Sequence, residues 1–128
     1  MKRGGLGAAI GCLALAASLA VACGPTQGGG PPPTLPPGGV AIVADDLAFD
    51  TQRLEVRAGA GFGLLLENRE GAPHNVRIYD DGSADPLFVG EIFSGPATRL
   101  YHVPALPAGT HRFRCDVHPA MSGDVIAR

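Results

Sequence analysis

From about residue 40 to its end, the chain alternates short apolar runs with residues that favour turns. Glycine, proline, aspartate and asparagine separate the runs, and no segment repeats apolar residues at a helical spacing over a useful length. Such runs predict short β-strands packed into one all-β domain of seven to eight strands, a small sandwich or barrel. The runs lie at residues 40–43, 47–49, 53–57, 62–67, 74–79, 87–89, 99–103, 110–115 and 124–127.

The first 39 residues show a different pattern, which divides them into two parts. Lys2 and Arg3 precede an uncharged apolar stretch that ends in small residues at 20–22. This pattern predicts an export signal at residues 1–22, too short and too weakly bounded to be preferred as a membrane span. Residues 23–39 carry no charge and are rich in glycine and proline. They predict a linker, part flexible and part extended, before a domain at residues 40–128.

Cys23 stands at the predicted cleavage point. Residues 19–24, Leu-Ala-Val-Ala-Cys-Gly, resemble a bacterial lipobox, although Ala20 occupies the position where such boxes favour leucine. The resemblance implies lipidation of Cys23, whereas ordinary cleavage at the same bond would leave a free thiol. With lipidation, we expect the exported chain to be anchored through Cys23 to the outer face of the cytoplasmic membrane; otherwise we expect it in the periplasm.

The use of cysteine sets the domain apart from most exported proteins. Cys12 lies in the predicted signal and Cys23 at the start of the linker, which leaves Cys115 as the one cysteine of the domain. Exported proteins usually pair their cysteines, so a single thiol calls for another explanation, such as metal binding. Removal of the signal also leaves eight arginines against 12 acidic residues. No cationic surface is expected, which argues against a nucleic-acid partner.

Cys115 begins a short segment that contains three kinds of metal donor. The sequence Cys115-Asp-Val-His118-Pro-Ala-Met121 supplies a thiolate, an imidazole and a thioether, and His74 supplies a second imidazole far upstream. Two imidazoles, one thiolate and one weak thioether are the ligands of a blue-copper electron-transfer site. Phe113 and Cys115 share one face of the predicted strand, so a core position for Phe113 would direct the thiol inward.

Three passages together resemble a cupredoxin of the plastocyanin and amicyanin kind. The Pro-His-Asn-Val sequence at 73–76 resembles the strand that carries the first histidine. Residues 107–115 resemble the penultimate strand, with His111 where tyrosine is common, and residues 115–121 resemble the ligand loop of amicyanin-like members. The resemblance covers residues 40–128 and implies a Greek-key β-sandwich or barrel.

The resemblance also implies a cofactor and a set of residues that hold it. One copper ion per chain, alternating between Cu(I) and Cu(II), would be bound by two histidines, one cysteine and a distant axial methionine. The carbonyl before the first histidine would lie beside the metal, and the asparagine after it would brace the cysteine loop by hydrogen bonding. Carried onto this sequence, the ligands are His74, Cys115, His118 and Met121, and the supporting residues are Pro73 and Asn75.

These residues predict an electron carrier and not an enzyme. The expected role is to shuttle single electrons, as a monomer, between redox protein partners such as a cytochrome or an oxidoreductase complex, with His118 as the electron port. The alternative is a copper-binding protein for storage or delivery, which could use the same ligands. A catalytic Cys-His nucleophile is disfavoured because the sequence offers no oxyanion hole. A zinc site is disfavoured because methionine is a poor zinc ligand. A dinuclear copper centre would need a second cysteine in the loop.

The remaining histidines and an acidic turn have less specific interpretations. His111 is expected in the core or at one end of the domain, and His102 is expected to be exposed at a strand end. Asp80, Asp81 and Asp85 could steer a cationic partner. A solvated turn is the more ordinary interpretation of these three carboxylates.

Overall fold

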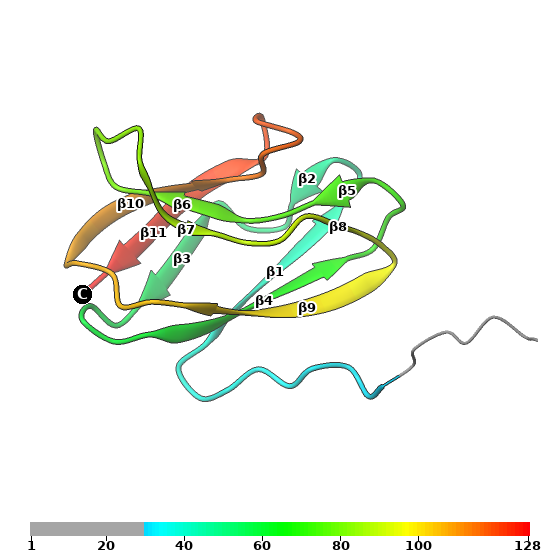
Figure 1. The fold of residues 1–128 in the computed structure, drawn as a ribbon, viewed down its shortest axis with the longest axis horizontal. Coiled ribbons are helices and arrows are strands. Elements are labelled where there is room, and N and C mark those ends of the chain that lie inside the picture. Colours follow the sequence, from blue (N-terminus) through cyan, green and yellow to red (C-terminus); the bar gives the residue numbers. More distant parts are fainter. Residues whose placement is uncertain (1–29) are drawn as a thin grey trace, which may run out of the picture.

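A computed structural model describes residues 30–128 of the chain, and these residues form an all-β structure (Figure 1). The predicted signal at 1–22, with Cys12, and the predicted lipidation site Cys23 lie outside the described residues. In chain order the strands are β1 (Val40–Asp45), β2 (Ala48–Phe49), β3 (Arg53–Val56), β4 (Phe62–Asn68), β5 (Pro73–His74), β6 (Arg77–Tyr79), β7 (Pro86–Val89), β8 (Phe93–Ser94), β9 (Ala97–Val103), β10 (Gly109–Arg114) and β11 (Ser122–Ala127).

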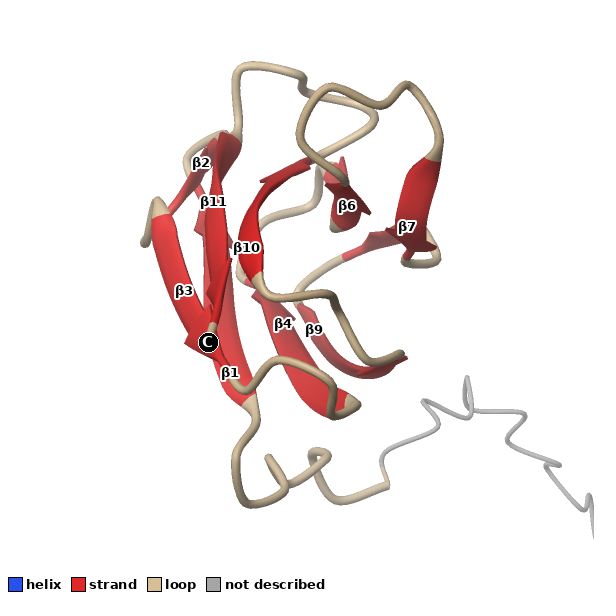
Figure 2. Cartoon of the chain, turned by 90° about the vertical axis from the view of Figure 1, so that its left-hand side faces the viewer, coloured by secondary structure: helices blue, strands red, loops and turns tan. Residues whose placement is uncertain are grey.

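The strands are arranged in two main sheets and one short pair. The first sheet has the order β2-β1-β4-β9, the second has the order β3-β11-β10-β6-β7, and β5 pairs with β8 alone. The β1–β4 and β3–β11 pairs are parallel, and the other pairs are antiparallel. Figure 2 shows the strands standing as layers with the connecting loops gathered at the two ends. Within residues 30–128 no helix is long and apolar enough to cross a membrane.

Alternation along the strands places the core between the two sheets. In β4, Leu64 and Leu66 are fully buried, and in β10 the buried residues His111 and Phe113 alternate with exposed arginines. Because successive strand residues point to opposite faces, each strand contributes every second side chain to the core. The core therefore reaches Cys115, which is fully buried immediately after β10.

The predicted all-β sandwich is confirmed, with two differences in detail. Eleven strands occur in the described residues, but β2, β5 and β8 have only two residues each, which leaves eight longer strands. The sheets form a sandwich and do not close into a barrel. The run at 74–79, which predicted a single strand, is divided between the β5–β8 pair and the second sheet. Asn75 and Val76 interrupt it, and the Asn75 side chain bonds to neighbouring segments instead of continuing the ladder.

The chain joins the sandwich at the end opposite His74. The parallel strands β1 and β4 both run toward the end of the sandwich that carries His74. At that end Arg69 N donates to Ala44 O at 2.9 Å. At the other end Pro36 packs on Gly63, where an added Cβ would lie 2.6 Å from the proline ring, so that position requires glycine. Since β1 has six residues, its two ends are separated by about 20 Å.

Candidate metal centre

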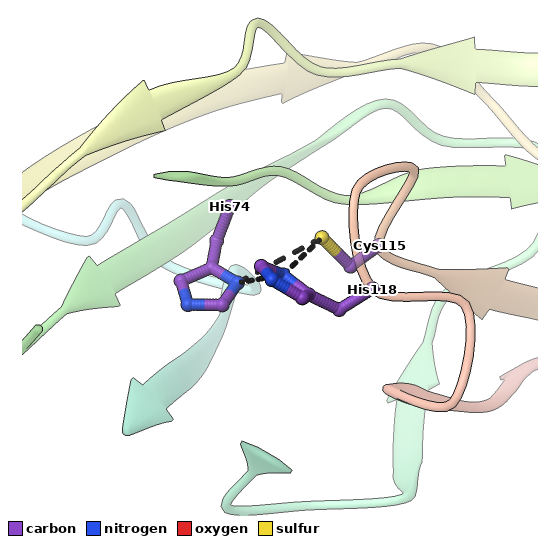
Figure 3. Close-up of side chains that lie close together, drawn as sticks. All are labelled: His74, Cys115 and His118. Carbon is purple, nitrogen blue, oxygen red and sulfur yellow. Dashed lines mark hydrogen bonds between the residues drawn. The ribbon is translucent and has the colours of Figure 1, made fainter. Parts of the chain in front are cut away.

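Three donor atoms from two distant parts of the chain converge at one end of the sandwich (Figure 3). The His74 Nδ1 atom lies 3.8 Å from the Cys115 sulfur and 3.3 Å from His118 Nδ1, and the distance from Cys115 Sγ to His118 Nδ1 is 4.0 Å. His74 and Cys115 are fully buried, whereas His118 is partly exposed. The structure thus brings together three of the four predicted ligands across 41 positions of sequence.

The spacing of these atoms suits a single metal ion. The three distances define a triangle whose centre is about 2.2 Å from each atom, close to the usual lengths of metal–imidazole and metal–thiolate bonds. Two imidazole nitrogens and one thiolate in a trigonal arrangement are the donor set of a copper electron-transfer site. The residues present therefore fit a copper ion without rearrangement of the chain.

Cys115 and His118 are placed by a loop that closes on its own backbone. Cys115 continues the inward alternation of β10, and its N–H donates to Met121 O at 3.0 Å. Met121 N donates in turn to His118 O at 2.9 Å. Met121, the predicted axial ligand, is itself buried, with 3% of its surface exposed. These two bonds hold the loop in a compact turn, in which the Cys115 sulfur lies 4.0 Å from His118 Nδ1.

His74 is placed by the short strand pair and by a carboxylate. In the β5–β8 pair, Pro73 lies opposite Ser94 and His74 lies opposite Phe93. The outer ring nitrogen of His74, Nε2, lies 2.8 Å from Glu70 Oε1. The Nδ1 atom is on the other side of the ring, where it faces Cys115 and His118. The imidazole is thus held at Nε2, while its Nδ1 is directed at the two other donors.

Asn75 links the histidine segment to the cysteine loop. Its Oδ1 accepts the N–H of Asp116 at 2.9 Å, and its Nδ2 donates to Asp116 Oδ2 at 2.8 Å and to Gly90 O at 2.9 Å. Asp116 also lies 3.1 Å from Arg77 Nε. The side chain of Asn75 is fully buried, so its hydrogen bonds are shielded from water. These hydrogen bonds join the residue after His74 to the residue after Cys115.

The two remaining histidines and the acidic turn do not belong to the cluster of His74, Cys115 and His118. His111 is buried at 2% exposure, with Nε2 2.8 Å from Pro107 O and Nδ1 3.2 Å from Asp80 Oδ1. It occupies the core position that we predicted, and His102 is exposed near the end of β9, as expected. The approach of Asp80 to His111 is a close contact without a hydrogen bond, because His111 Nδ1 has no hydrogen-bond partner among the residues that the structure describes. Asp80, Asp81 and Asp85 are all exposed in the turn.

Sequence reasoning did not identify Glu70 or Asp116 as parts of the site. Glu70 stands four residues before His74 and Asp116 directly follows Cys115, but nearby carboxylates are common on protein surfaces. The hydrogen bond from the Leu47 N–H, with a further contribution from the His74 imidazole, holds the pKa of the Glu70 carboxyl below its ordinary value, although partial desolvation opposes this. Glu70 is therefore ionised at neutral pH and faces His74 as an acceptor.

Comparisons with known proteins place this site in a familiar fold. A family model described as a cupredoxin-like domain matches residues 12–127. Reduced auracyanin of Roseiflexus castenholzii is 18% identical with a TM-score of 0.63, over 71% of this chain and 97% of that protein. Auracyanin A of Chloroflexus aurantiacus, a "blue" copper protein, is 21% identical with a TM-score of 0.61, over 70% and 100%. The amicyanin of Paracoccus versutus is 27% identical with a TM-score of 0.57, over 73% and 85%. The search of the curated proteins found no match.

Proposed function

Because this chain belongs to the family of cupredoxin-like domains, we propose that it is a type 1 copper protein that shuttles single electrons between redox partners outside the cytoplasmic membrane. The observation that carries the proposal is the convergence of His74 Nδ1, Cys115 Sγ and His118 Nδ1, which all lie within 4.8 Å of one another. Met121 is proposed as the weak fourth ligand. Family membership also supports the expectation that the chain is not an enzyme.

The support for electron transfer comes from how firmly the donors are held. A copper ion supplies one-electron chemistry because its two oxidation states can share a ligand set of imidazole, thiolate and thioether. His74 is fixed by β5 and Glu70, and Cys115 is fixed by β10 and by the Asn75–Asp116 hydrogen bonds. Small movement of the ligands between the two states favours fast exchange of electrons.

The partly exposed side of the site is the proposed route for electrons. His74 and Cys115 are fully buried, so of the three converging donors only His118 reaches toward the surface. We assign the His118 imidazole as the port through which a redox protein partner, such as a cytochrome or an oxidoreductase complex, exchanges electrons. The exposed side chain of Val117, at 41% exposure, lies next to it in the loop.

The proposal is tested by the optical and magnetic signature of the copper-loaded chain. Residues 24–128 are loaded with one equivalent of Cu(II), and absorption and EPR spectra are recorded before and after ascorbate. An intense blue band, a narrow hyperfine splitting and reversible bleaching are expected. The Cys115→Ser variant should lose the blue band, whereas Val117→Ala, a control in the same loop, should keep it. An ordinary pale Cu(II) spectrum would favour copper storage or delivery instead.

The proposed location rests on Cys23, which we propose to be lipidated and inserted in the outer face of the cytoplasmic membrane. The supporting observation is that the chain enters β1 at the end of the sandwich opposite His74. A tether at that end would leave the copper end free to meet a partner. Mass spectrometry of the membrane fraction tests this directly, because an unmodified Cys23 would contradict the anchor and leave a periplasmic protein.

A further inference from the structure

The carboxylate of Glu70 connects a proposed copper ligand to a surface turn. Its Oε1 atom lies 2.8 Å from His74 Nε2 and accepts the N–H of Leu47 at 2.9 Å. Leu47 belongs to the turn between β1 and β2, 23 positions before Glu70 in the sequence. The His74 side chain is fully buried and that of Glu70 is 22% exposed, so the contact is largely shielded from solvent. Glu70 and its contacts with His74 and Leu47 were not among the site features predicted from the sequence.

The contact with Glu70 determines which nitrogen of His74 carries the proton. An ionised carboxylate can only accept hydrogen bonds, so the nitrogen that faces it must be protonated. Nε2 faces Glu70, which leaves Nδ1 with its lone pair in the neutral imidazole. Nδ1 is the atom that lies 3.8 Å from Cys115 Sγ and 3.3 Å from His118 Nδ1. A neutral His74 in this tautomer presents a ready donor to the metal position.

Glu70 is itself held at three of its polar atoms. Its backbone N donates to Asn68 Oδ1 at 3.1 Å, its carbonyl oxygen accepts the N–H of Gly95 at 3.1 Å, and its Oε1 accepts the N–H of Leu47. Asn68 is buried and donates from Nδ2 to Ala72 O and Phe93 O, which ties the segment to β8. The carboxylate is therefore fixed in place by contacts within the fold.

The turn that donates to Glu70 has an uncommon backbone. Asp46 and Leu47 have φ angles of 50° and 54°, in the left-handed region that side chains other than glycine rarely occupy. Such a conformation is unfavourable for a residue like leucine and persists only where the surrounding structure imposes it. Leu47 is also 54% exposed, so burial of its side chain does not account for the conformation. In this conformation the Leu47 N–H donates a hydrogen bond to Glu70.

We propose that Glu70 is a positioning residue that selects the Nδ1 donor of His74, and that the Asp46–Leu47 turn holds this carboxylate in place. The inference rests on the proposed copper site. The negative charge makes the imidazole a stronger electron donor, which favours Cu(II) over Cu(I) and lowers the reduction potential. A simpler alternative is that Glu70 only joins the β1–β2 turn to the 69–73 loop, in which case its loss would change stability and leave the imidazole unchanged.

The first test needs no metal and reads the imidazole directly. Nitrogen-15 NMR of the metal-free chain should show His74 as the Nε2–H tautomer, with slow exchange of that proton and of the Leu47 amide. Glu70→Ala should speed the exchange of both, whereas Glu70→Gln, which keeps an acceptor oxygen, should keep the tautomer. Protonation of Nδ1 in the wild-type chain, or unchanged exchange of both protons in Glu70→Ala, would overturn the inference.

The second test uses the copper-loaded chain and a matched control. Glu70→Ala should weaken copper binding about 10–100-fold, the usual effect of removing a partner of a metal-bound histidine. Glu70→Gln should keep most of the affinity and raise the reduction potential. Glu67→Gln removes the same charge from β4, where Glu67 bonds to Arg69, and should change the potential much less. Equal shifts in the two glutamine variants, or unchanged affinity in Glu70→Ala, would overturn the inference.

The two proposals fail in distinguishable ways. If the wild-type chain gave no blue copper spectrum, the proposed function would fail, while the tautomer of His74 would still report on Glu70. If the wild-type spectrum were blue and Glu70→Gln left the potential unchanged, the copper site would stand. Glu70 would then have only a structural role.

Discussion

The two histidines of the site are supported by different kinds of structure. His74 lies in a strand pair, is fully buried, and has Nε2 bonded to Glu70. His118 lies in the short loop that follows Cys115, is partly exposed, and is held through the backbone bond from Met121 N to its carbonyl oxygen. The difference indicates a division of roles, in which the His74 side is fixed within the fold and the loop side closes the site and reaches toward the surface.

The largest expected effect depends on whether a small ligand can reach the position of each histidine from solvent. His118→Gly should abolish the blue band of the copper-loaded chain, and millimolar imidazole should restore it, because a small ligand can enter from the exposed side. His74→Gly should also abolish the band, but imidazole should not restore it, since that position is sealed within the fold. Absorption spectra of both variants with and without imidazole make the measurement. Equal recovery in the two variants would contradict the division of roles.

The next largest expected effect is a loss of stability on replacing either of two buried asparagines, one on each side of the site. Asn75 braces Asp116 on the loop side, and Asn68 braces Glu70 on the His74 side. Each change to alanine leaves buried backbone groups without a partner, so each should lower the free energy of unfolding by about 2–3 kcal/mol. Denaturant unfolding of the metal-free chains measures the losses.

Hydrogen exchange can then locate the effect of each asparagine change. Asn75→Ala should speed exchange of the Asp116 amide, and Asn68→Ala that of the Glu70 amide. Each change should leave the other amide protected, because the two braces belong to different segments. Exposure of both amides in either variant would mean that the two sides of the site open together.

The comparison also shows which parts of the site local sequence could predict. Alternation is a local property, so Phe113 and Cys115 could be assigned to the inner face of one strand from the sequence alone. The loop donors could be recognised because Cys115, His118 and Met121 lie within seven residues. Glu70 was missed because its role depends on Leu47, 23 positions away, and on the folding back of the 69–73 loop. No periodicity reports such a contact.

Contacts between distant segments also account for the errors in the predicted strands. The run at 74–79 has the composition of one strand, but Asn75 uses its side chain to bond Asp116, 41 positions away, and the ladder breaks there. The β5–β8 pair has only two residues in each strand, too few to produce a pattern. Both features depend on contacts between segments that are distant in the sequence, and a local pattern does not report such contacts.

A steric change can perturb the His74 side alone. An added Cβ at Gly95 would lie 2.4 Å from Asn68 O and 2.6 Å from Glu70 O, both backbone atoms. Gly95→Ala should therefore displace the loop and lower the free energy of unfolding by about 1–3 kcal/mol. Gly71→Ala is the control in the same loop, because nothing lies within 4 Å of its added Cβ. Thermal unfolding of both variants should show a loss for Gly95→Ala only; an equal loss would remove the steric explanation.

The smallest expected effect is the dependence of stability on pH through Glu70. The Leu47 N–H and the His74 imidazole hold the pKa of the Glu70 carboxyl below its ordinary value of 4.5 in the folded chain. A carboxyl with a lowered pKa stabilises the folded state above its unfolded pKa, and that contribution is lost as the pH falls through the lower, folded value. Wild-type chain should therefore be more stable than Glu70→Gln at pH 7, and the difference should shrink as the pH falls below about 4.5. Denaturant unfolding of the two metal-free chains between pH 7 and pH 3 measures it. A difference that stays constant over that range would mean that the Glu70 charge does not stabilise the His74 side, and that hydrogen-bond geometry alone supports this histidine.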